Sequence, residues 1–220
     1  MNIQATTRTG HFAAASAAAA QDPRHVTLLI YEAGPGWNTA VPPDRQELAA
    51  HFAYVGKALA DGRIQAYGLQ SDAIRGFYLF NSSDPDAVEA FTQSDPGVSA
   101  SILKAVEKLD WTLAIDALPP LQPSDVLQML KYRQGPRWVA GKSLFEQDIA
   151  EHLKYVTAAA QSGLVVGGGP VSNGEGLYLL RTDNAEVAAN FIARDPAVIA
   201  GIFSPVAVGW NILAMAPSKP

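Results

Sequence analysis

The stretch AAHFAYVGKALADGR at residues 49–63 occurs a second time, in diverged form, as AEHLKYVTAAAQSGL at residues 150–164. Each copy predicts an amphipathic helix, because apolar residues recur at helical spacing. These apolar positions are Leu48, Phe52, Val55 and Leu59 in the first copy and Ile149, Leu153, Val156 and Ala160 in the second. Both helices carry a histidine at the same position, His51 and His152. The fold and the function therefore have to explain the duplication and the histidine together.

The repeat extends beyond the helix over most of the chain. Identical residues recur at an offset of 101 and, after a gap, at an offset of 100. The matched pairs include Tyr31/Tyr132, Trp37/Trp138, Tyr54/Tyr155, Gly76/Gly176, Tyr78/Tyr178 and Asp95/Asp195, and a second gap brings Trp111 into line with Trp210. Matches in this order predict an internal duplication.

Each copy reads as the same series of elements. Strand-like runs rich in branched and aromatic residues occupy 25–34, 63–69 and 76–81 in the first copy and 126–135, 164–169 and 176–181 in the second. A second helix is expected at 84–93 and again at 184–193, and each copy ends in a strand that contains a tryptophan. The order is βαββαβ, the ferredoxin-like split unit.

A four-stranded sheet with both helices on one side leaves its other face uncovered, and a second copy of the sheet can cover it. We therefore expect an α+β fold in which tandem ferredoxin-like units pack sheet to sheet as a pseudo-dimeric barrel. The expected domains are residues 25–115 and 126–220, and the whole chain could self-associate further. Residues 116–125 contain three prolines and are expected to form the linker.

Residues 1–24 differ from the rest because they are rich in alanine. Small residues before Gln21 and the basic Arg8 loosely fit a secretory signal, whereas the weak apolar character favours a disordered leader. The protein is expected to be exported to a periplasm if residues 1–20 act as a cleavable signal, and to be cytoplasmic if they do not.

Composition excludes several classes of function. A net charge of −5 and a pI near 5.3 argue against a nucleic-acid partner. The chain lacks an apolar run of the roughly 20 residues that cross a bilayer. It has no cysteine, and its histidines and acidic residues lack the close spacing of a metal site. Dinucleotide and phosphate-loop motifs are missing, so we expect no cofactor and no metal.

Besides the histidine, the recurring ionisable group is an aspartate followed by proline, Asp95 and Asp195. Aspartate before proline is an ordinary helix N-cap. The histidines are expected at the edge of the buried stripe, where one ring nitrogen could reach a cleft. Either these residues only cap and pack, or a carboxylate orients each histidine for proton transfer near neutral pH.

The segments EHLKYV, GLVVGGGP, GLYLL and RDPAV resemble the YCII-related family, once per half of residues 26–215. The resemblance implies a ferredoxin-like unit that pairs into a dimeric α+β barrel, and it implies that a helix histidine and the Asp-Pro aspartate form a catalytic dyad. By position the dyads are His152 with Asp195 and His51 with Asp95. The activities proposed for the family are lyase and dehydrochlorinase steps, and the wider barrel superfamily includes isomerases, monooxygenases and haem enzymes.

The second half fits this pattern better, because Gly169-Pro170 matches the family's Gly-Pro whereas the first half has Gly68-Leu69. Arg194, directly before Asp195, either binds a substrate carboxylate or is a solvated residue. Four aromatic residues are expected either to line a pocket or to pack in the core: Trp37, Trp138, Tyr54 and Tyr155.

Two functions remain open from the sequence. The first is a cofactor-free lyase or isomerase that uses a His-Asp dyad on a small cyclic or aromatic organic acid. The alternative is a non-catalytic protein that binds a small molecule or another partner.

Overall fold

The computed structural model describes residues 22–71, 74–118, 123 and 125–216. The first half contains β1 (Arg24–Ala33), a 3-10 turn η1 (Pro43–Arg45), α1 (Ala49–Ala60), β2 (Ile64–Gln70), β3 (Arg75–Phe80), α2 (Pro85–Ser94), α3 (Pro96–Ser99) and β4 (Leu103–Leu113). A short strand, β5 (Ile115–Asp116), follows. The second half contains β6 (Val126–Gln134), η2 (Leu144–Glu146), α4 (Ala150–Gln161), β7 (Val165–Pro170), β8 (Gly176–Leu180), α5 (Ala185–Arg194), α6 (Pro196–Ile199) and β9 (Phe203–Met215).

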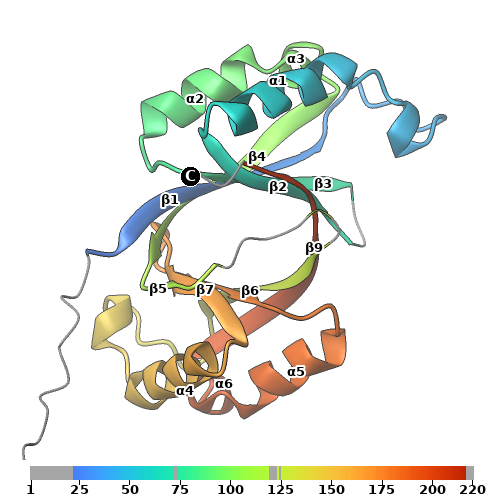
Figure 1. The fold of residues 1–220 in the computed structure, drawn as a ribbon. Helices are drawn as coiled ribbons and strands as arrows, with labels where there is room; N and C mark the ends of the chain where they lie inside the picture. Colours follow the sequence, from blue (N-terminus) through green and yellow to red (C-terminus); the bar gives the residue numbers. More distant parts are fainter. Residues whose placement is uncertain (1–21, 72–73, 119–122, 124, 217–220) are drawn as a thin grey trace, which may run out of the picture.

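All of these strands belong to one curled antiparallel sheet, in the order β4-β1-β3-β2-β9-β6-β8-β7-β5. The two halves join where β2 pairs with β9, from Ala66 opposite Met215 to Gln70 opposite Trp210. On the other side, β5 pairs with β7 and a single bridge links Trp111 to Val171. Figure 1 shows α1, α2 and α3 outside one part of the sheet and α4, α5 and α6 outside the other. The sheet therefore curls around an interior with helices on its outer faces.

Side-chain alternation along the strands separates this interior from the helix-covered layers. On β8, Leu177 and Leu179 face the interior, while Tyr178 and Leu180 face the helices. The interior cluster draws buried residues from both halves, among them Leu28, Leu79, Trp111, Leu127, Leu179 and Trp210. Burying this shared face is the main contribution that holds the halves together, since apolar burial stabilises by about 25 cal/mol per Å².

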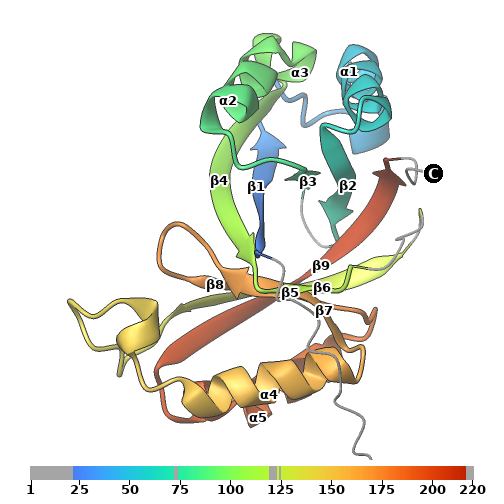
Figure 2. The same ribbon diagram turned by 60° about the vertical axis from the view of Figure 1, so that its left-hand side comes forward.

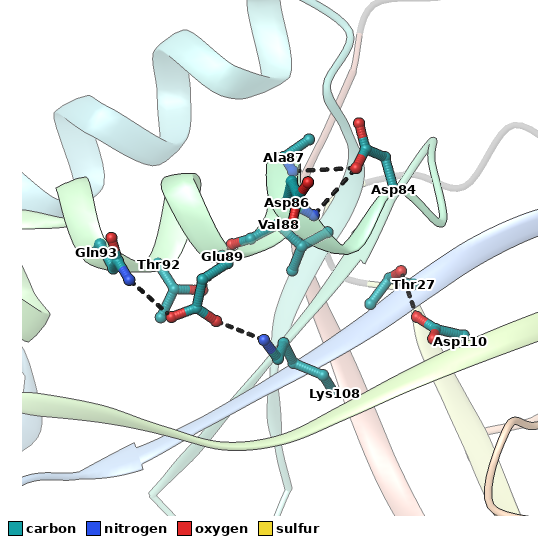
Figure 3. A network of polar contacts seen from close by, with 10 residues as sticks. All are labelled: Thr27, Asp84, Asp86, Ala87, Val88, Glu89, Thr92, Gln93, Lys108 and Asp110. Carbon is teal, nitrogen blue, oxygen red and sulfur yellow. Dashed lines mark hydrogen bonds and ion pairs between the residues drawn. The ribbon is translucent and has the colours of Figure 1, made fainter.

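Polar contacts fix the second helix of the first half to its sheet, as Figure 3 shows. The Asp84 carboxylate caps α2 by accepting from the backbone N–H groups of Asp86 and Ala87. One turn later, Glu89 pairs with Lys108 of β4. These contacts set the direction of α2, whose last residue precedes Asp95.

Two boundaries differ from the sequence-based expectation. Strand β1 begins at Arg24, inside the expected leader, and Arg24 pairs with Asp116 at 2.7 Å. The expected linker starts with β5, which hydrogen-bonds to Gly167 and Gly168, because a free edge of β7 was available for pairing. The expectations for residues 1–21 lie outside the described part of the chain, and so do those for 119–122 and 124.

A shared interior predicts one cooperative unfolding transition for the two halves. In a W37F/W111F variant the remaining tryptophans report on the second half, and in W138F/W210F they report on the first. We expect fluorescence and far-UV circular dichroism to give the same urea midpoint within each variant. Separate midpoints for the two probes would contradict a single unit.

Candidate functional site

Both helix histidines lie between their helix and the outer face of the sheet. His51 is 1% exposed and His152 is 2% exposed, whereas Phe52 and Leu153 are 44% and 43% exposed. The expected apolar stripe is therefore wrong at these positions, because the histidine points inward and its apolar neighbour points outward. Hydrogen bonds to both ring nitrogens offset the cost of burying the imidazole.

The structure brings each histidine to its aspartate. His51 Nδ1 lies 2.8 Å from Asp95 Oδ1, and His152 Nδ1 lies 2.7 Å from Asp195 Oδ2. Both carboxylates are fully buried. Each also accepts the backbone N–H two residues ahead, so the expected capping role is confirmed for α3 and α6. One carboxylate thus holds a helix end and a histidine at once.

The sequence led us to expect that the second ring nitrogen would reach a cleft, but in the structure this nitrogen is hydrogen-bonded to a tyrosine. His51 Nε2 is 2.9 Å from the hydroxyl of Tyr78, and His152 Nε2 is 3.0 Å from that of Tyr178. The site in each half is therefore a chain of three groups, which we call the Asp–His–Tyr chain.

A glycine makes room for each tyrosine ring. A Cβ added at Gly76 would lie 2.8 Å from Cε2 of Tyr78, and one added at Gly168 would lie 2.3 Å from Cδ1 of Tyr178. Gly76 is two residues before Tyr78 on β3, so both positions face the helix layer. Gly168 instead lies opposite Tyr178 on the neighbouring strand β7. In each half the tyrosine ring occupies space that a side chain at the glycine would fill.

The hydrogen bonds constrain where the protons of the chain lie. An ionised carboxylate can only accept, so Nδ1 of each histidine carries a proton, and in the neutral form of the ring Nε2 accepts the tyrosine O–H. Burial raises the pKa of Tyr78, and the charge of Asp95 raises it further. Burial and the charge of Asp195 raise the pKa of Tyr178 in the same way. Both tyrosines are therefore neutral near pH 7 and able to donate.

The two chains differ at a second tyrosine. Tyr132 donates from its hydroxyl to Asp195 Oδ2 at 2.9 Å. Its counterpart, Tyr31, is equally buried, but its hydroxyl finds no partner at hydrogen-bond geometry among the described residues. Asp195 therefore has one more donor than Asp95.

Each chain borders a cavity. The first cavity, of about 140 Å³, is lined by His51 and Tyr78 together with Trp37, Leu48, Phe52 and Leu103. The second cavity, of about 160 Å³, is lined by His152 and Tyr178 together with Phe145, Leu153, Pro170 and Phe203. Both linings are mainly apolar.

Of the other residues predicted from the sequence to bind substrate, some line the two cavities and the rest pack elsewhere. Trp37 lines the first cavity, and Gly169 and Pro170 line the second. Tyr54 and Tyr155 donate their hydroxyls to the backbone carbonyls of Phe91 and Phe191. Trp138 packs against Phe203 in the helix-covered layer.

The structure does not bring Arg194 to His152. Arg194 is the last residue of α5 and, with Tyr155, lines a separate surface cavity. It lies next to Asp195 in sequence, but the buried aspartate turns inward as a cap while the arginine side chain lies on the outer surface of the helix. Of the two alternatives for Arg194, this geometry favours the solvated residue over a carboxylate contact beside His152.

Sequence reasoning left Tyr78 and Tyr178 out of the site, although it recorded both as matched positions. The signal that could have found them is the motif Gly-x-Tyr, which recurs in both copies at the same offset as Asp95 and Asp195. Alternation along a strand puts Gly and Tyr on one face. The sequence did not indicate that this face of the strand packs against the helix that carries the histidine.

Comparisons with known proteins agree with this fold. The family model of the YCII-related domain matches residues 27–112, which is the first half of the chain. No curated protein matches the sequence. A heme-binding protein from Thermus thermophilus has a TM-score of 0.55 and 13% identity, and the match covers 88% of this chain and 92% of that one.

Two further solved structures are similar. A mutant chlorite dismutase from Candidatus Nitrospira defluvii in complex with cyanide has a TM-score of 0.58 and 11% identity, covering 88% of this chain and 92% of that chain. An anthrone oxidase-like protein has a TM-score of 0.53 and 12% identity, covering 90% of this chain and 95% of that chain. At this level of identity the likeness shows a shared α+β barrel fold and nothing about the reaction.

The fold neighbours raise the question of haem, and the two cavities do not fit it. Pockets for drug-sized ligands hold about 300–1,000 Å³, which is more than either cavity offers. Both ring nitrogens of His51 and of His152 already have hydrogen-bond partners in the protein, so neither nitrogen is free to bind an iron.

The described residues contain no group of three or more metal-ligating side chains. No helix in the described part of the chain is long and apolar enough to span a membrane.

Buried tyrosines predict a loss of stability at alkaline pH. Burial raises the pKa of Tyr31, Tyr78, Tyr132 and Tyr178, whereas unfolded tyrosine titrates near 10. Above about pH 10 the unfolded chain releases protons that the folded chain keeps, so the free energy of unfolding falls as pH rises, by up to about 1.4 kcal/mol per pH unit for each tyrosine.

Urea unfolding from about pH 9 to about pH 11.5 measures this slope. A Y78F/Y178F variant should show a shallower fall than the wild type. Y54F is the control, because that side chain is only partly buried. An unchanged slope in Y78F/Y178F would contradict the buried, neutral state of the two hydroxyls.

Proposed function

We propose that this protein is a YCII-like general acid–base catalyst that acts on a small, ring-shaped organic molecule without a cofactor. The observation that carries the proposal is the Asp–His–Tyr chain, which is buried, fully hydrogen-bonded and placed beside an apolar cavity in both halves. A structural role alone gives little reason for a buried ionisable chain to border a cavity twice.

We also infer that the two halves are tandem copies of one ferredoxin-like unit, of which the family match covers the first. The order β-α-β-β-α-α-β is the same in both halves. The contacts of His51 recur at His152 with distances that agree within about 0.1 Å. Duplication of a complete site is the simplest origin of such agreement.

The proposed step is removal of a proton from a carbon next to a carbonyl group. The tyrosine oxygen takes the substrate proton while its own proton passes to Nε2 of the histidine, and the imidazolium that forms is stabilised by the buried aspartate. The electron pair of the broken C–H bond forms an enolate. Return of the proton at another carbon completes an isomerisation, and loss of chloride from the neighbouring carbon completes an elimination.

The cavities set the size of the substrate. An apolar cavity of about 150 Å³ holds one benzene molecule, and the two cavities here are of that size. Apolar and aromatic side chains favour a flat ring over a sugar or a phosphate ester. A single six-membered or five-membered ring is therefore the substrate size that fits.

A binding protein without catalysis is the second candidate. This candidate is favoured because the polar groups of the Asp–His–Tyr chain already have hydrogen-bond partners within the protein. Each aspartate caps a helix, and each histidine has two partners. In that case the same cavities would hold a ring-shaped ligand, and the chain would only fix the helix to the sheet.

Deuterium incorporation from D₂O into single-ring ketones and lactones, followed by NMR, tests the proposal. Wild-type protein should exchange the hydrogen next to the carbonyl. A H51N/H152N variant should lose about 10²–10⁴-fold of the rate, which is the usual contribution of a general acid–base group. Y78F/Y178F should lose a comparable factor, because the tyrosine oxygen is the atom that takes the proton.

A Y54F/Y155F variant is the matched control, since it removes two hydroxyls that bond to backbone outside both cavities. It should keep the wild-type rate. Exchange at the wild-type rate in H51N/H152N would overturn the role of the Asp–His–Tyr chain. Binding of the ring probes with no exchange by the wild type would favour the non-catalytic protein.

A further inference from the structure

The two cavities carry different charges at their rims. Glu32 on β1 lies opposite Arg75 on β3. The corresponding positions in the second half are Arg133 on β6 and Glu175 directly before β8, so the two charges are exchanged between the equivalent positions. In the first half the cation, Arg75, lies on β3 together with Tyr78. In the second half the cation, Arg133, lies on β6, the neighbour of the strand that carries Tyr178.

As a result, the two cavities differ in the charged side chains that line them. Arg75 and Glu32 both line the first cavity. Among the described residues that line the second cavity there is no lysine, arginine, aspartate or glutamate. Glu175 turns instead toward Lys131, 3.6 Å away, which also pairs with Glu107.

Glu32 at the first cavity is shared by two cations, Arg75 in the cavity lining and Lys104 outside it. Arg75 Nη2 is 3.2 Å from one carboxylate oxygen of Glu32, and Lys104 Nζ is 2.9 Å from the other. Two cations thus share one anion. Lys104, and after it Arg75, lowers the pKa of Glu32, which keeps this carboxylate ionised.

We infer that the first cavity takes a ring-shaped ligand that bears a carboxylate, with Arg75 as the residue that determines this specificity, and that the second cavity takes an uncharged ring. The inference rests on the proposed function, because it names the substrate class of the same two sites. The inference therefore assigns carboxylate binding to Arg75 on β3 instead of Arg194 on α5.

Arginine suits this role because its planar group offers five N–H donors and matches a carboxylate in two parallel hydrogen bonds. The contact to Glu32 uses the Nη2 nitrogen. Arg75 is about half exposed at the cavity rim, so a ligand carboxylate can approach it without complete desolvation. Glu32 then acts as a competitor that a ligand anion has to displace or outweigh.

Calorimetric titration with benzoate and with benzyl alcohol tests the inference, because the two probes have the same ring and differ in charge. R75Q should weaken benzoate binding by about tenfold, the loss expected for one charge-assisted contact, and leave benzyl alcohol binding unchanged. E32Q should strengthen benzoate binding, since it removes the competing carboxylate. R194Q is the matched control and should change neither, because Arg194 lines another cavity.

The outcomes separate this inference from the proposed function. The H51N/H152N variant should still bind benzoate with dependence on Arg75, since binding requires no proton transfer. Equal weakening by R75Q and R194Q, an R75Q variant with unchanged benzoate affinity, or wild-type protein that binds benzyl alcohol but not benzoate would overturn the inference while leaving acid–base catalysis untouched.

Discussion

A buried carboxylate is the group on which both sites depend. Asp95 and Asp195 are fully buried, and an unpaired charge at such a position would cost several kcal/mol. Each is stabilised by the backbone N–H of the helix that it caps and by the histidine of the neighbouring helix. The same oxygen atoms therefore fix the spacing of two helices, the tautomer of the imidazole and, through the imidazole, the position of the tyrosine hydroxyl.

The curled sheet carries Tyr78 on β3 and Tyr178 on β8, and it supports the helices that carry the other groups of each chain. Its interior is filled by side chains from both halves, and each site lies between its histidine helix and the outer face of the sheet. Figure 2 shows α1 and α4 on opposite sides of the curled sheet. Because the interior is shared, each site rests on a sheet that the other half stabilises. Equivalent positions of the two halves still differ locally, as Glu32 and Arg75 do from Arg133 and Glu175.

The repeat, the order of elements and the pairing of His51 with Asp95 could be inferred from the sequence, because each depends on identity or local spacing. The inward turn of His51 could not, since a periodic apolar pattern placed Phe52 inside, and only the tertiary partners Asp95 and Tyr78 reverse that preference. Arg194 failed as a candidate for a similar reason. Adjacency in sequence to Asp195 says nothing about which way a residue at a helix end points.

The state of the imidazole protons tests the central claim most directly. Nitrogen-15 NMR of protein labelled in histidine should show that His51 and His152, in their neutral form, carry the proton on Nδ1, with Nε2 as the acceptor from tyrosine. Replacement of Tyr78 and Tyr178 by phenylalanine should then shift both Nε2 signals toward the position of an unbonded nitrogen. Protons found on Nε2, or Nε2 signals that ignore the loss of the two hydroxyls, would contradict the Asp–His–Tyr chain.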